Sequence, residues 1–325
     1  MSVATKTASP VPLRDALTRV RSFGVVLALI VLVVIVTVAQ PAFLAPGNLM
    51  NILSQWAPIA IMGVGMTYVV ITGGFDLSVA AVFALGGVVA AGLGQTMAPM
   101  IAFLVAVAVG ALAGLLNGFI VTVLRVNPFI ATLGSSLILG GVALVVTANR
   151  PFVVAFADFG ILGSGRFLGV PYSGMVAILV MVVGGLVLAY TAYGQNVYAV
   201  GGNLEASHLS GIHTTRVVSL AYVLSGACAG LAGGISASQL SSAQASMGAN
   251  LLFDVLTVVI VGGTSLAGGK GAVWRTAVGV GILATLQNGF NLLDVDPYYQ
   301  NIIKGLIIIA ALANVRFSRR IRPAA

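Results

Sequence analysis

Charged residues are scarce in this sequence: Asp, Glu, Lys and Arg make up 7% of its 325 residues, whereas hydrophobic residues make up 59%. Soluble domains contain about 25% charged residues, so the composition excludes an ordinary water-soluble fold. Apolar runs close to the ~20 residues that cross a bilayer as a helix recur along most of the chain. We therefore predict an all-α, multi-pass membrane protein.

Cysteine and histidine are nearly absent, with Cys228, His208 and His213 as the full set. A single cysteine excludes an intrachain disulfide and a cysteine-cluster metal site. The two histidines share one loop, but they have no Cys or carboxylate beside them to complete a metal site. The sequence also has no cluster of His, Cys and acidic residues that could carry catalysis. We predict no catalytic residue, no metal site and no cofactor bound by this chain, which disfavours a membrane enzyme.

The apolar runs predict about ten spans. Their expected bounds are Ser22 to Gln40, Ile52 to Thr72, Leu77 to Gly94, Ile101 to Leu124, Phe129 to Thr147, Gly174 to Tyr193, Val217 to Leu240, Leu251 to Ser265, Ala272 to Leu292 and Gln300 to Val315. Residues 1–21 and 316–325 are then tails, and residues 22–315 form the transmembrane domain, with a long loop at 195–216. The N-terminus resembles a signal peptide, but the many later spans favour an uncleaved first helix.

The net charge of +8 is spread over short loops and tails rather than gathered in one patch, so we expect no nucleic-acid partner. With a cytoplasmic N-terminus, most basic residues fall inside, as the positive-inside rule requires. Both termini are then cytoplasmic. The inside set is Lys6, Arg14, Arg19, Arg21, Arg125, Arg216, Lys270, Arg275, Arg316, Arg319, Arg320 and Arg322, and the outside set is Arg150, Arg166 and Lys304.

The segment GGFDLSVA, Gly73 to Ala80, places the acid Asp76 between two apolar runs. In one interpretation Asp76 caps a helix that opens at Leu77 by accepting hydrogen bonds from its free amides. In the other, Gly73 and Gly74 break the helix and Asp76 fixes a gate or lines a path, because ionisable residues at membrane depth are usually functional.

The stretch VVITGGFDL, Val69 to Leu77, is partly repeated as VVIVGGTSL, Val258 to Leu266. Two glycine-broken helices in corresponding halves of a membrane protein indicate a transport site. Broken or re-entrant helices near Gly73 and Gly262 are therefore an alternative to simple spans.

The run GGTSLAGGKG, Gly262 to Gly271, superficially resembles a phosphate-binding loop. That motif needs a Gly, four residues, then Gly-Lys and a hydroxyl residue. Here Thr264 occupies the first Gly position and Gly271 follows Lys270. The chain cannot bind ATP by this route, so any ATP coupling must come from a partner protein.

The loop at 195–216 is too patterned for a simple connector. Asn203 can cap a short helix over Leu204 to Ser210, and Gly211 can end it in the left-handed conformation. Its exposed face would carry Glu205 and His208, with only Arg216 as a nearby basic residue. A peripheral protein is therefore preferred to anionic membrane lipid as its partner.

These segments resemble the ATP-binding-cassette importer permeases, specifically the ribose-type monosaccharide permease family. The loop is similar to that family's coupling-helix segment, GGFDLSVA to its segment after the second span, NPFIATLG (Asn127 to Gly134) to the opening of the fifth, and GGTSLAGGKG to its late glycine loop. The resemblance runs from about Asn48 to Asn314. The chain departs from the family with Glu205-Ala206-Ser207, where a second Ala is more common, and with His208, where a basic residue is common.

The resemblance implies an inner-membrane permease for a monosaccharide or related polyol. Its partners would be a second copy of the permease or a paralogous permease, a cytoplasmic ABC ATPase that binds ATP and Mg, and a periplasmic or lipid-anchored solute-binding protein. The residues expected to couple to the ATPase are Gly201, Gly202, Asn203, Glu205, Ala206, His208, Ser210 and Gly211.

Polar or aromatic residues in or beside the spans are candidates for the path or gate, because amides and hydroxyls suit a polyol and an aromatic ring can stack on a sugar. They are Asp76, Asn117, Asn127, Phe129, Thr132, Gln287, Asn288 and Asn291. A branched-chain amino-acid ABC permease has a similar architecture and remains a rival. An ion-coupled secondary transporter is a second rival, although only Asp76 and Asp254 lie near spans.

Overall fold

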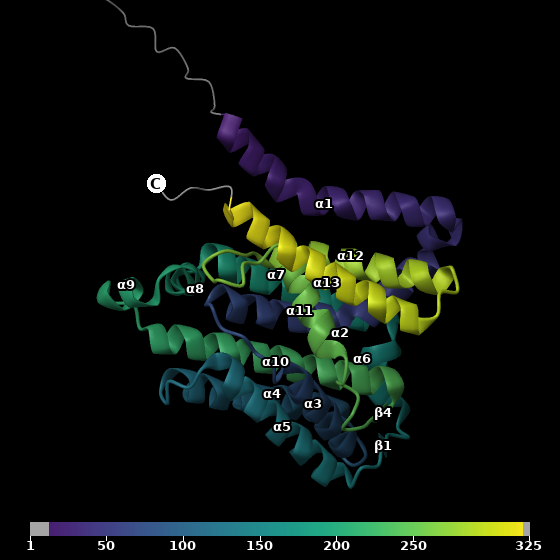
Figure 1. Cartoon of the computed structure of the whole chain (residues 1–325). Coiled ribbons are helices and arrows are strands. Elements are labelled where there is room, and N and C mark those ends of the chain that lie inside the picture. Colours follow the sequence, from purple (N-terminus) through teal and green to yellow (C-terminus); the bar gives the residue numbers. More distant parts are fainter. Residues whose placement is uncertain (1–12, 321–325) are drawn as a thin grey trace, which may run out of the picture.

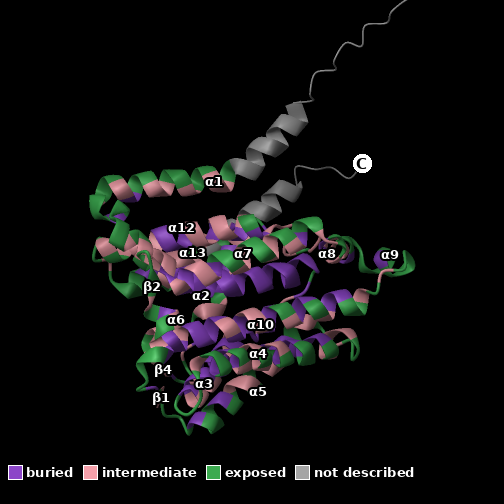
Figure 2. Cartoon of the chain, turned by 180° about the vertical axis from the view of Figure 1, so that it is seen from behind, coloured by how far each residue is buried: buried purple, intermediate pink, exposed green. Residues whose placement is uncertain are grey.

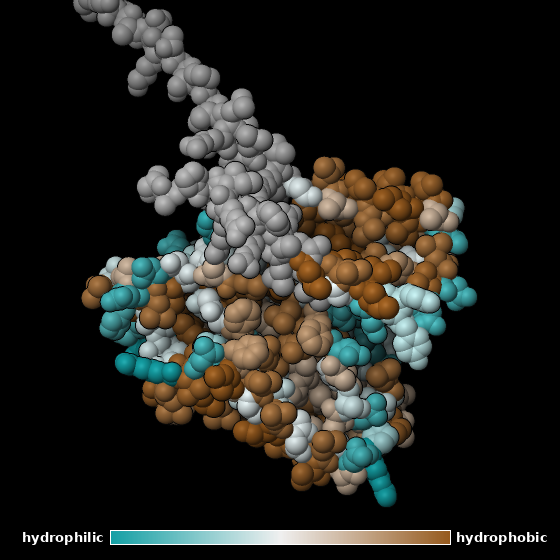
Figure 3. All heavy atoms as spheres, viewed as in Figure 1, coloured by the Kyte–Doolittle hydropathy of each residue, from teal (hydrophilic) through white to brown (hydrophobic). Residues whose placement is uncertain are grey.

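The computed structural model of the chain describes residues 13–320 and consists almost entirely of helices that run along one common direction (Figure 1). The short helices α8 and α9 lie at one end of this bundle, and strands β1 and β4 lie at the other (Figure 1). Hydrophobic side chains cover the middle of the face in Figure 3, with hydrophilic ones toward both ends. This arrangement agrees with the predicted all-α membrane fold.

The helices are α1 (Leu13–Ala39), α2 (Pro46–Ile71), α3 (Val79–Gly94), α4 (Pro99–Thr122), α5 (Pro128–Thr147), α6 (Ile161–Ser164), α7 (Tyr172–Tyr190), α8 (Ala192–Gly202), α9 (Leu204–Leu209), α10 (Thr214–Leu240), α11 (Leu251–Val261), α12 (Val273–Leu292) and α13 (Pro297–Arg320), with 3-10 turns η1 (Pro41–Leu44) and η2 (Ala157–Gly160). Two antiparallel strand pairs complete the fold: β1 (Phe152–Val153) with β4 (Ser242–Ala243), and β2 (Arg166–Phe167) with β3 (Val170–Pro171).

Each of the ten predicted spans coincides with a helix, but only part of this set meets the usual length and apolarity of a membrane span. Within the described residues, five helices do so, namely α2, α4, α5, α7 and α10. Three apolar helices are shorter: Gly24–Ala39 of α1, α3 and α11. The all-α membrane class is therefore supported, whereas the count of ten spans stays a prediction.

Several predicted bounds were wrong because side chains and glycines set the helix ends locally. The predicted sixth span continued to Tyr193, but α7 ends at Tyr190 and α8 starts anew at Ala192, where the Thr191 hydroxyl accepts a hydrogen bond from the Gly194 amide. The predicted eighth span ran to Ser265, but α11 ends at Val261.

The termini extend beyond the predicted spans. Helix α1 begins at Leu13 rather than Ser22, and α13 continues to Arg320 rather than ending at Val315. The described ends of both helices lie toward the same end of the bundle as α9 (Figure 1). Residues 1–12 and 321–325 of the predicted tails, with Lys6 and Arg322, lie outside the described residues. Which side of the membrane this end faces stays a prediction.

Helix α10 is the central element and packs against α2, α3 and α4 (Figure 2). A methyl group added to Gly226 would meet the carbonyl oxygen of Gly110, and one added to Gly110 would meet that of Gly226. Gly114 lies equally close to the carbonyl of Tyr222. Lipid tails are as apolar as the helix surfaces, so the hydrophobic effect does not bring helices together in a membrane. Helices there associate through such close backbone approach instead. These glycines therefore let α4 and α10 pack backbone against backbone.

The chain between α10 and α11 re-enters the bundle. After β4 pairs with β1 near one end, Met247 reaches Gly87 of α3, and Gly248 then packs on the Ala80 carbonyl in the first turn of α3. This segment therefore runs back along α3, and α11 starts partway along the length of the bundle rather than at its end. The short length of α11 follows from that start.

Candidate functional site

The helix expected to meet the ATPase forms as predicted. Asn203 has an extended backbone, and its side-chain oxygen accepts a hydrogen bond from the Ala206 amide at 2.9 Å. At the other end, the Gly211 amide donates to the His208 carbonyl and the Ile212 amide to the Ser207 carbonyl. This pair of bonds is the Schellman motif, and Gly211 supplies its left-handed residue with φ of 84°. The predicted caps of α9 are confirmed.

The surface of α9 is almost entirely exposed, because Ser207 is the one buried residue of its six. Leu204 and Leu209 are 57% and 82% exposed beside Glu205 and His208. Ala206, Ser210 and Gly211 of the predicted coupling set are exposed as well. Large exposed apolar side chains next to charged ones are typical of a protein-docking surface. Figure 1 shows α9 projecting from the end of the bundle.

Gly201 differs from the rest of the predicted coupling set, because it faces the bundle. A side chain there would meet the carbonyl of Ile71, and the amide of Gly269 lies beside it. The Gly269 amide in turn donates to the Ile71 carbonyl at 2.8 Å. Gly202 ends α8 and is exposed. Helix α8, which carries α9, is thus seated on the end of α2 and on the loop 262–272.

A tyrosine makes a second link between α8 and that loop. The Tyr198 hydroxyl donates to the Gly271 carbonyl at 2.8 Å. Burial raises the pKa of Tyr198, so the hydroxyl keeps the proton that it donates. Any displacement of α8 must therefore move the loop 262–272 and the end of α2, or break these contacts.

The repeated sequence VVI-x-GG corresponds to a repeated structure. The Gly73 and Gly74 amides donate to the carbonyls of Val70 and Val69, which ends α2 in a Schellman motif. The end of α11 repeats this motif with the amides of Gly263 and Thr264. Gly73 and Gly263 have φ of 84° and 90°. The structural match is therefore shifted by one residue from the sequence match, which pairs Gly73 with Gly262.

Asp76 lies beyond the first of these breaks and is 1% exposed. One carboxylate oxygen accepts from the Ser78 amide at 3.0 Å and from the Ser78 hydroxyl at 2.6 Å. The other accepts from the Ser225 hydroxyl of α10 at 2.7 Å. The first of our two interpretations, in which Asp76 is the N-cap of a helix that opens at Leu77, is wrong, since α3 begins at Val79 with Ser78 before it. Its carboxylate instead fastens the broken segment to α10.

Two further helices, α4 and α5, and a second residue of α10 hold the same segment, which runs from residue 72 to 78. The Asn117 amide of α4 donates to the Ser78 hydroxyl at 2.7 Å, and the Thr132 hydroxyl of α5 accepts from the Leu77 amide at 3.1 Å. The Tyr222 hydroxyl donates to the Phe75 carbonyl at 3.0 Å. Asp76, Asn117 and Thr132, which were separate candidates in the sequence, therefore meet in one cluster.

The remaining path candidates do not join this cluster. Asn127 accepts from the Phe129 amide and so caps α5, and Phe129 is 52% exposed. On α12, Asn288 exchanges amide hydrogen bonds of 2.9 Å with Asn48, and Asn291 accepts from Gln300. Gln287 is half-buried beside them. Asn288 and Asn291 thus connect α12 to α2 and α13.

An ion pair inside the bundle was missed from the sequence. Lys304, which we counted with the outer basic residues at the start of the last predicted span, lies within α13, with its ammonium nitrogen 3.1 Å from a carboxylate oxygen of Asp254 on α11. Their side chains are 19% and 16% exposed. Two opposite charges inside predicted spans were the available signal, because intramembrane ions usually pair. The hydroxyls of Thr67 and Thr276 lie 2.6 Å apart, but this pair was not predictable because neither residue is charged.

Comparison with known proteins adds independent information. A family model described as "Branched-chain amino acid transport system / permease component" matches residues 48–312. The ribose import permease protein RbsC of Escherichia coli strain K12 is 43% identical over 291 residues, which cover 88% of this chain and 91% of that protein. RbsC of Bacillus subtilis strain 168 is 39% identical, with 90% and 92% covered. The D-allose transport system permease protein AlsC of E. coli K12 is 34% identical, with 90% of each covered.

No solved structure matches the chain. The sequence matches nevertheless extend over nearly all of the chain and of its relatives, so they concern a whole permease rather than a shared segment. They confirm the resemblance inferred from the motifs, including its expected extent from about Asn48 to Asn314. Such permeases are transport subunits rather than enzymes. The chain therefore belongs to the ribose-type family of ABC importer permeases, which are multi-pass proteins of the bacterial inner membrane.

Proposed function

We propose that this chain conducts a monosaccharide or a closely related polyol into the cell, receiving it from an external binding protein and using ATP hydrolysed by a separate cytoplasmic ATPase. The names of three relatives support a sugar, since they specify ribose, D-allose and galactofuranose. The proposed coupling to the ATPase rests on how α8 packs against the bundle, where Gly201 lies against Ile71 and Gly269.

In this proposal the ATPase docks on α9. When two ATPase subunits close on ATP and Mg, they push α9, and α8 transmits the movement to the end of α2 and to the loop 262–272. Both glycine-broken segments begin at these two points, at Gly73 and Gly263. The pore, built from two copies of the permease or from one copy and a paralogue, then switches from inward- to outward-facing. Only an interaction that differs between the two states can drive this switch.

The sugar path is proposed to pass the cluster around Asp76. Asn117 and Thr132 bring an amide and a hydroxyl there, and Phe129 lies at the start of the same helix as Thr132, with half of its ring exposed. Hydroxyl groups of a sugar need partners that donate and accept, and amides and hydroxyls do both. A permease fed by a binding protein needs only weak contacts with its cargo.

The coupling role can be tested with two glycines that share one geometry. Gly211 ends α9 with φ of 84°, and Gly169 in the β2–β3 turn has φ of 85°, with no atom within 4 Å of an added methyl group at either. An alanine strains the backbone equally at both sites. In liposomes with the ATPase and binding protein, Gly211→Ala and Glu205→Ala should lose sugar uptake per ATP hydrolysed, while Gly169→Ala keeps it. Normal coupling in both α9 variants would remove the assignment of α9.

The family description also names branched-chain amino acids, which keeps an amino-acid cargo as the second candidate. Direct uptake measurements distinguish a sugar cargo from an amino-acid cargo. Uptake of labelled ribose, allose and leucine should be measured in the same liposomes with the cognate binding protein. Uptake of leucine alone would replace the sugar proposal without affecting the coupling proposal. Uphill uptake by the permease without any ATPase would instead indicate an ion-coupled transporter.

A further inference from the structure

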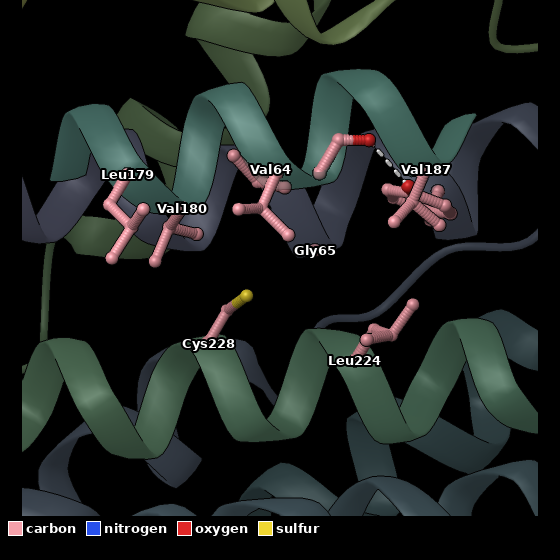
Figure 4. A pocket seen from close by; sticks show the side chains of 10 residues that line it. Val64, Gly65, Leu179, Val180, Val187, Leu224 and Cys228 are labelled. Carbon is pink, nitrogen blue, oxygen red and sulfur yellow. Dashed lines mark hydrogen bonds between the residues drawn. The ribbon is translucent and has the colours of Figure 1, made fainter. Parts of the chain in front are cut away.

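Helices α7 and α10 stand apart over α2 and leave an apolar groove between them. The groove encloses about 320 Å³ and is walled by Val180 and Val183 of α7 and by Leu224 and Cys228 of α10. Figure 4 shows Val180 of α7 facing Leu224 and Cys228 of α10 across the gap, with Gly65 of α2 behind. Val183 is 49% exposed, so the groove is open on the side of the bundle. In a membrane that side faces lipid wherever a second permease subunit does not cover it.

A second, larger cavity of about 480 Å³ lies between α8 and the start of α10, at the α9 end of the bundle. Its walls include Asn196, Ser210, His213 and Arg216, which offer hydrogen-bond donors. None of the residues that line either cavity is acidic. Within the described part of the chain, Arg216 forms no salt bridge. The cavity therefore favours an anionic group.

The two cavities adjoin. Tyr68 lines the groove and Tyr193 lines the second cavity, and their rings are stacked with centroids 6.0 Å apart. On α10, Leu220 lines the second cavity while Leu224 and Cys228 line the groove. Residues spaced by four share one face of a helix, so a single stripe of α10 passes through both. The basic cavity, here called the mouth, and the apolar groove, here called the shaft, therefore follow one another along one face of α10, with the stacked tyrosine rings between them.

We propose that this site binds one anionic phospholipid, with its phosphate at Arg216 and His213 and an acyl chain along Leu224 and Cys228. A free sugar does not fit the shaft, because an apolar wall cannot replace the hydrogen bonds that its hydroxyls make in water. Basic pockets at the cytoplasmic ends of membrane helices favour anionic head groups in general. The phosphate would lie beside Ser210 and Gly211, where α9 ends, and so behind the surface that carries Glu205 and His208.

Two substitutions test the binding of the lipid head group and the binding of its acyl chain separately. Arg216→Gln removes the charge of the mouth, and Arg125→Gln is its control, since Arg125 is also exposed but lines neither cavity. Val183→Trp fills the shaft from a half-exposed wall position. Val145→Trp is its control on α5, where the side chain is 81% exposed. Size-exclusion chromatography in detergent confirms that all four variants remain folded.

The full chain should be incubated with equal amounts of phosphatidylglycerol and phosphatidylcholine and re-isolated, and the retained lipid measured by mass spectrometry. We expect preferential retention of phosphatidylglycerol. Arg216→Gln should lower it about fivefold, the factor that ~1 kcal/mol for one basic residue near an anionic membrane surface corresponds to. Val183→Trp should lower retention of both lipids, and the two controls should behave as the unmodified chain.

Equal retention in the unmodified chain, Arg216→Gln and Val183→Trp would overturn the proposal. A loss only in Val183→Trp would overturn the anionic head group, and a loss only in Arg216→Gln would overturn the acyl chain in the shaft. Displacement by inorganic phosphate alone would also overturn it, because the ligand would then be a free anion. The experiment measures neither sugar uptake nor ATP hydrolysis, so its outcome is independent of the proposed function.

Discussion

The Ser225 hydroxyl of α10 donates a 2.7 Å hydrogen bond to the carboxylate of Asp76, which lies in the break between α2 and α3. The two residues are 149 positions apart in the sequence and are 0% and 1% exposed. A carboxylate placed so deep in the bundle depends on such partners, because burying a charge without them is costly. This bond therefore fixes the position of the broken segment relative to the central helix.

Replacing Ser225 by alanine should lower the free energy of unfolding more than the loss of a hydrogen bond between two hydroxyl groups does. Hydrogen bonds to charged groups contribute about 1.5–3 kcal/mol, whereas interhelical bonds in membranes average about 0.6 kcal/mol. Ser219→Ala on the same helix is the matched control, because Ser219 bonds only the Thr122 hydroxyl. Thermal unfolding in detergent should separate the two variants by more than ~1 kcal/mol. Equal stability of both would mean that the Asp76 bond contributes nothing special.

Tyr198→Phe tests the link between α8 and the loop 262–272. The variant loses one hydroxyl bond to the Gly271 carbonyl, which contributes about 1 kcal/mol. The fold and the surface of α9 should persist, so ATPase binding stays normal while sugar uptake per ATP falls. Tyr299→Phe is the control, since Tyr299 is 63% exposed. Unchanged uptake per ATP in Tyr198→Phe would show that the movement reaches the bundle by another contact.

Features encoded within a few residues were predictable from the sequence. The apolar runs located the helices, and Asn203 and Gly211 marked both ends of α9, because a cap depends only on the residues beside it. The repeated VVI-x-GG stretches likewise indicated two helix breaks before the structure showed both. Such signals need no knowledge of distant contacts.

Features that depend on distant partners were not predictable. The helix after Asp76 begins at Val79 rather than Leu77, and the Asp76 carboxylate is shared between the neighbouring Ser78 and the distant Ser225. The seat of Gly201 on Ile71 and Gly269 could not be inferred either, since a glycine in a loop gives no indication of what packs on it. The sequence also could not show that Thr132 belongs to the cluster around Asp76 and that the amides of α12 do not, because this depends on how the helices pack.

The ion pair of Asp254 and Lys304 is expected to hold α13 on the bundle. Removing one partner leaves the other charge without compensation in a mostly buried position, so Asp254→Asn and Lys304→Met should each destabilise the protein by ~1–3 kcal/mol. The reversed pair, Asp254→Lys with Lys304→Asp, should recover most of the loss. Thermal unfolding of the singles and the reversed double in detergent measures this. A double variant as unstable as the sum of its singles would show that the pair does not interact.

Gly110 provides a sharp test of how the central helix is packed. Its missing side chain lets α4 approach Gly226 of α10 so closely that an added methyl group would meet the Gly226 carbonyl. Gly141 on α5 is an apolar-helix glycine with no atom within 4 Å of an added methyl group. Gly110→Ala must push the backbones of α4 and α10 apart, because backbone atoms cannot move aside as a flexible side chain can. It should therefore severely reduce the amount of folded, monodisperse protein. Gly141→Ala should be neutral or slightly stabilising, since alanine favours a helix by up to ~1 kcal/mol over glycine. Equal yields of the two variants would mean that α4 and α10 do not touch at this point.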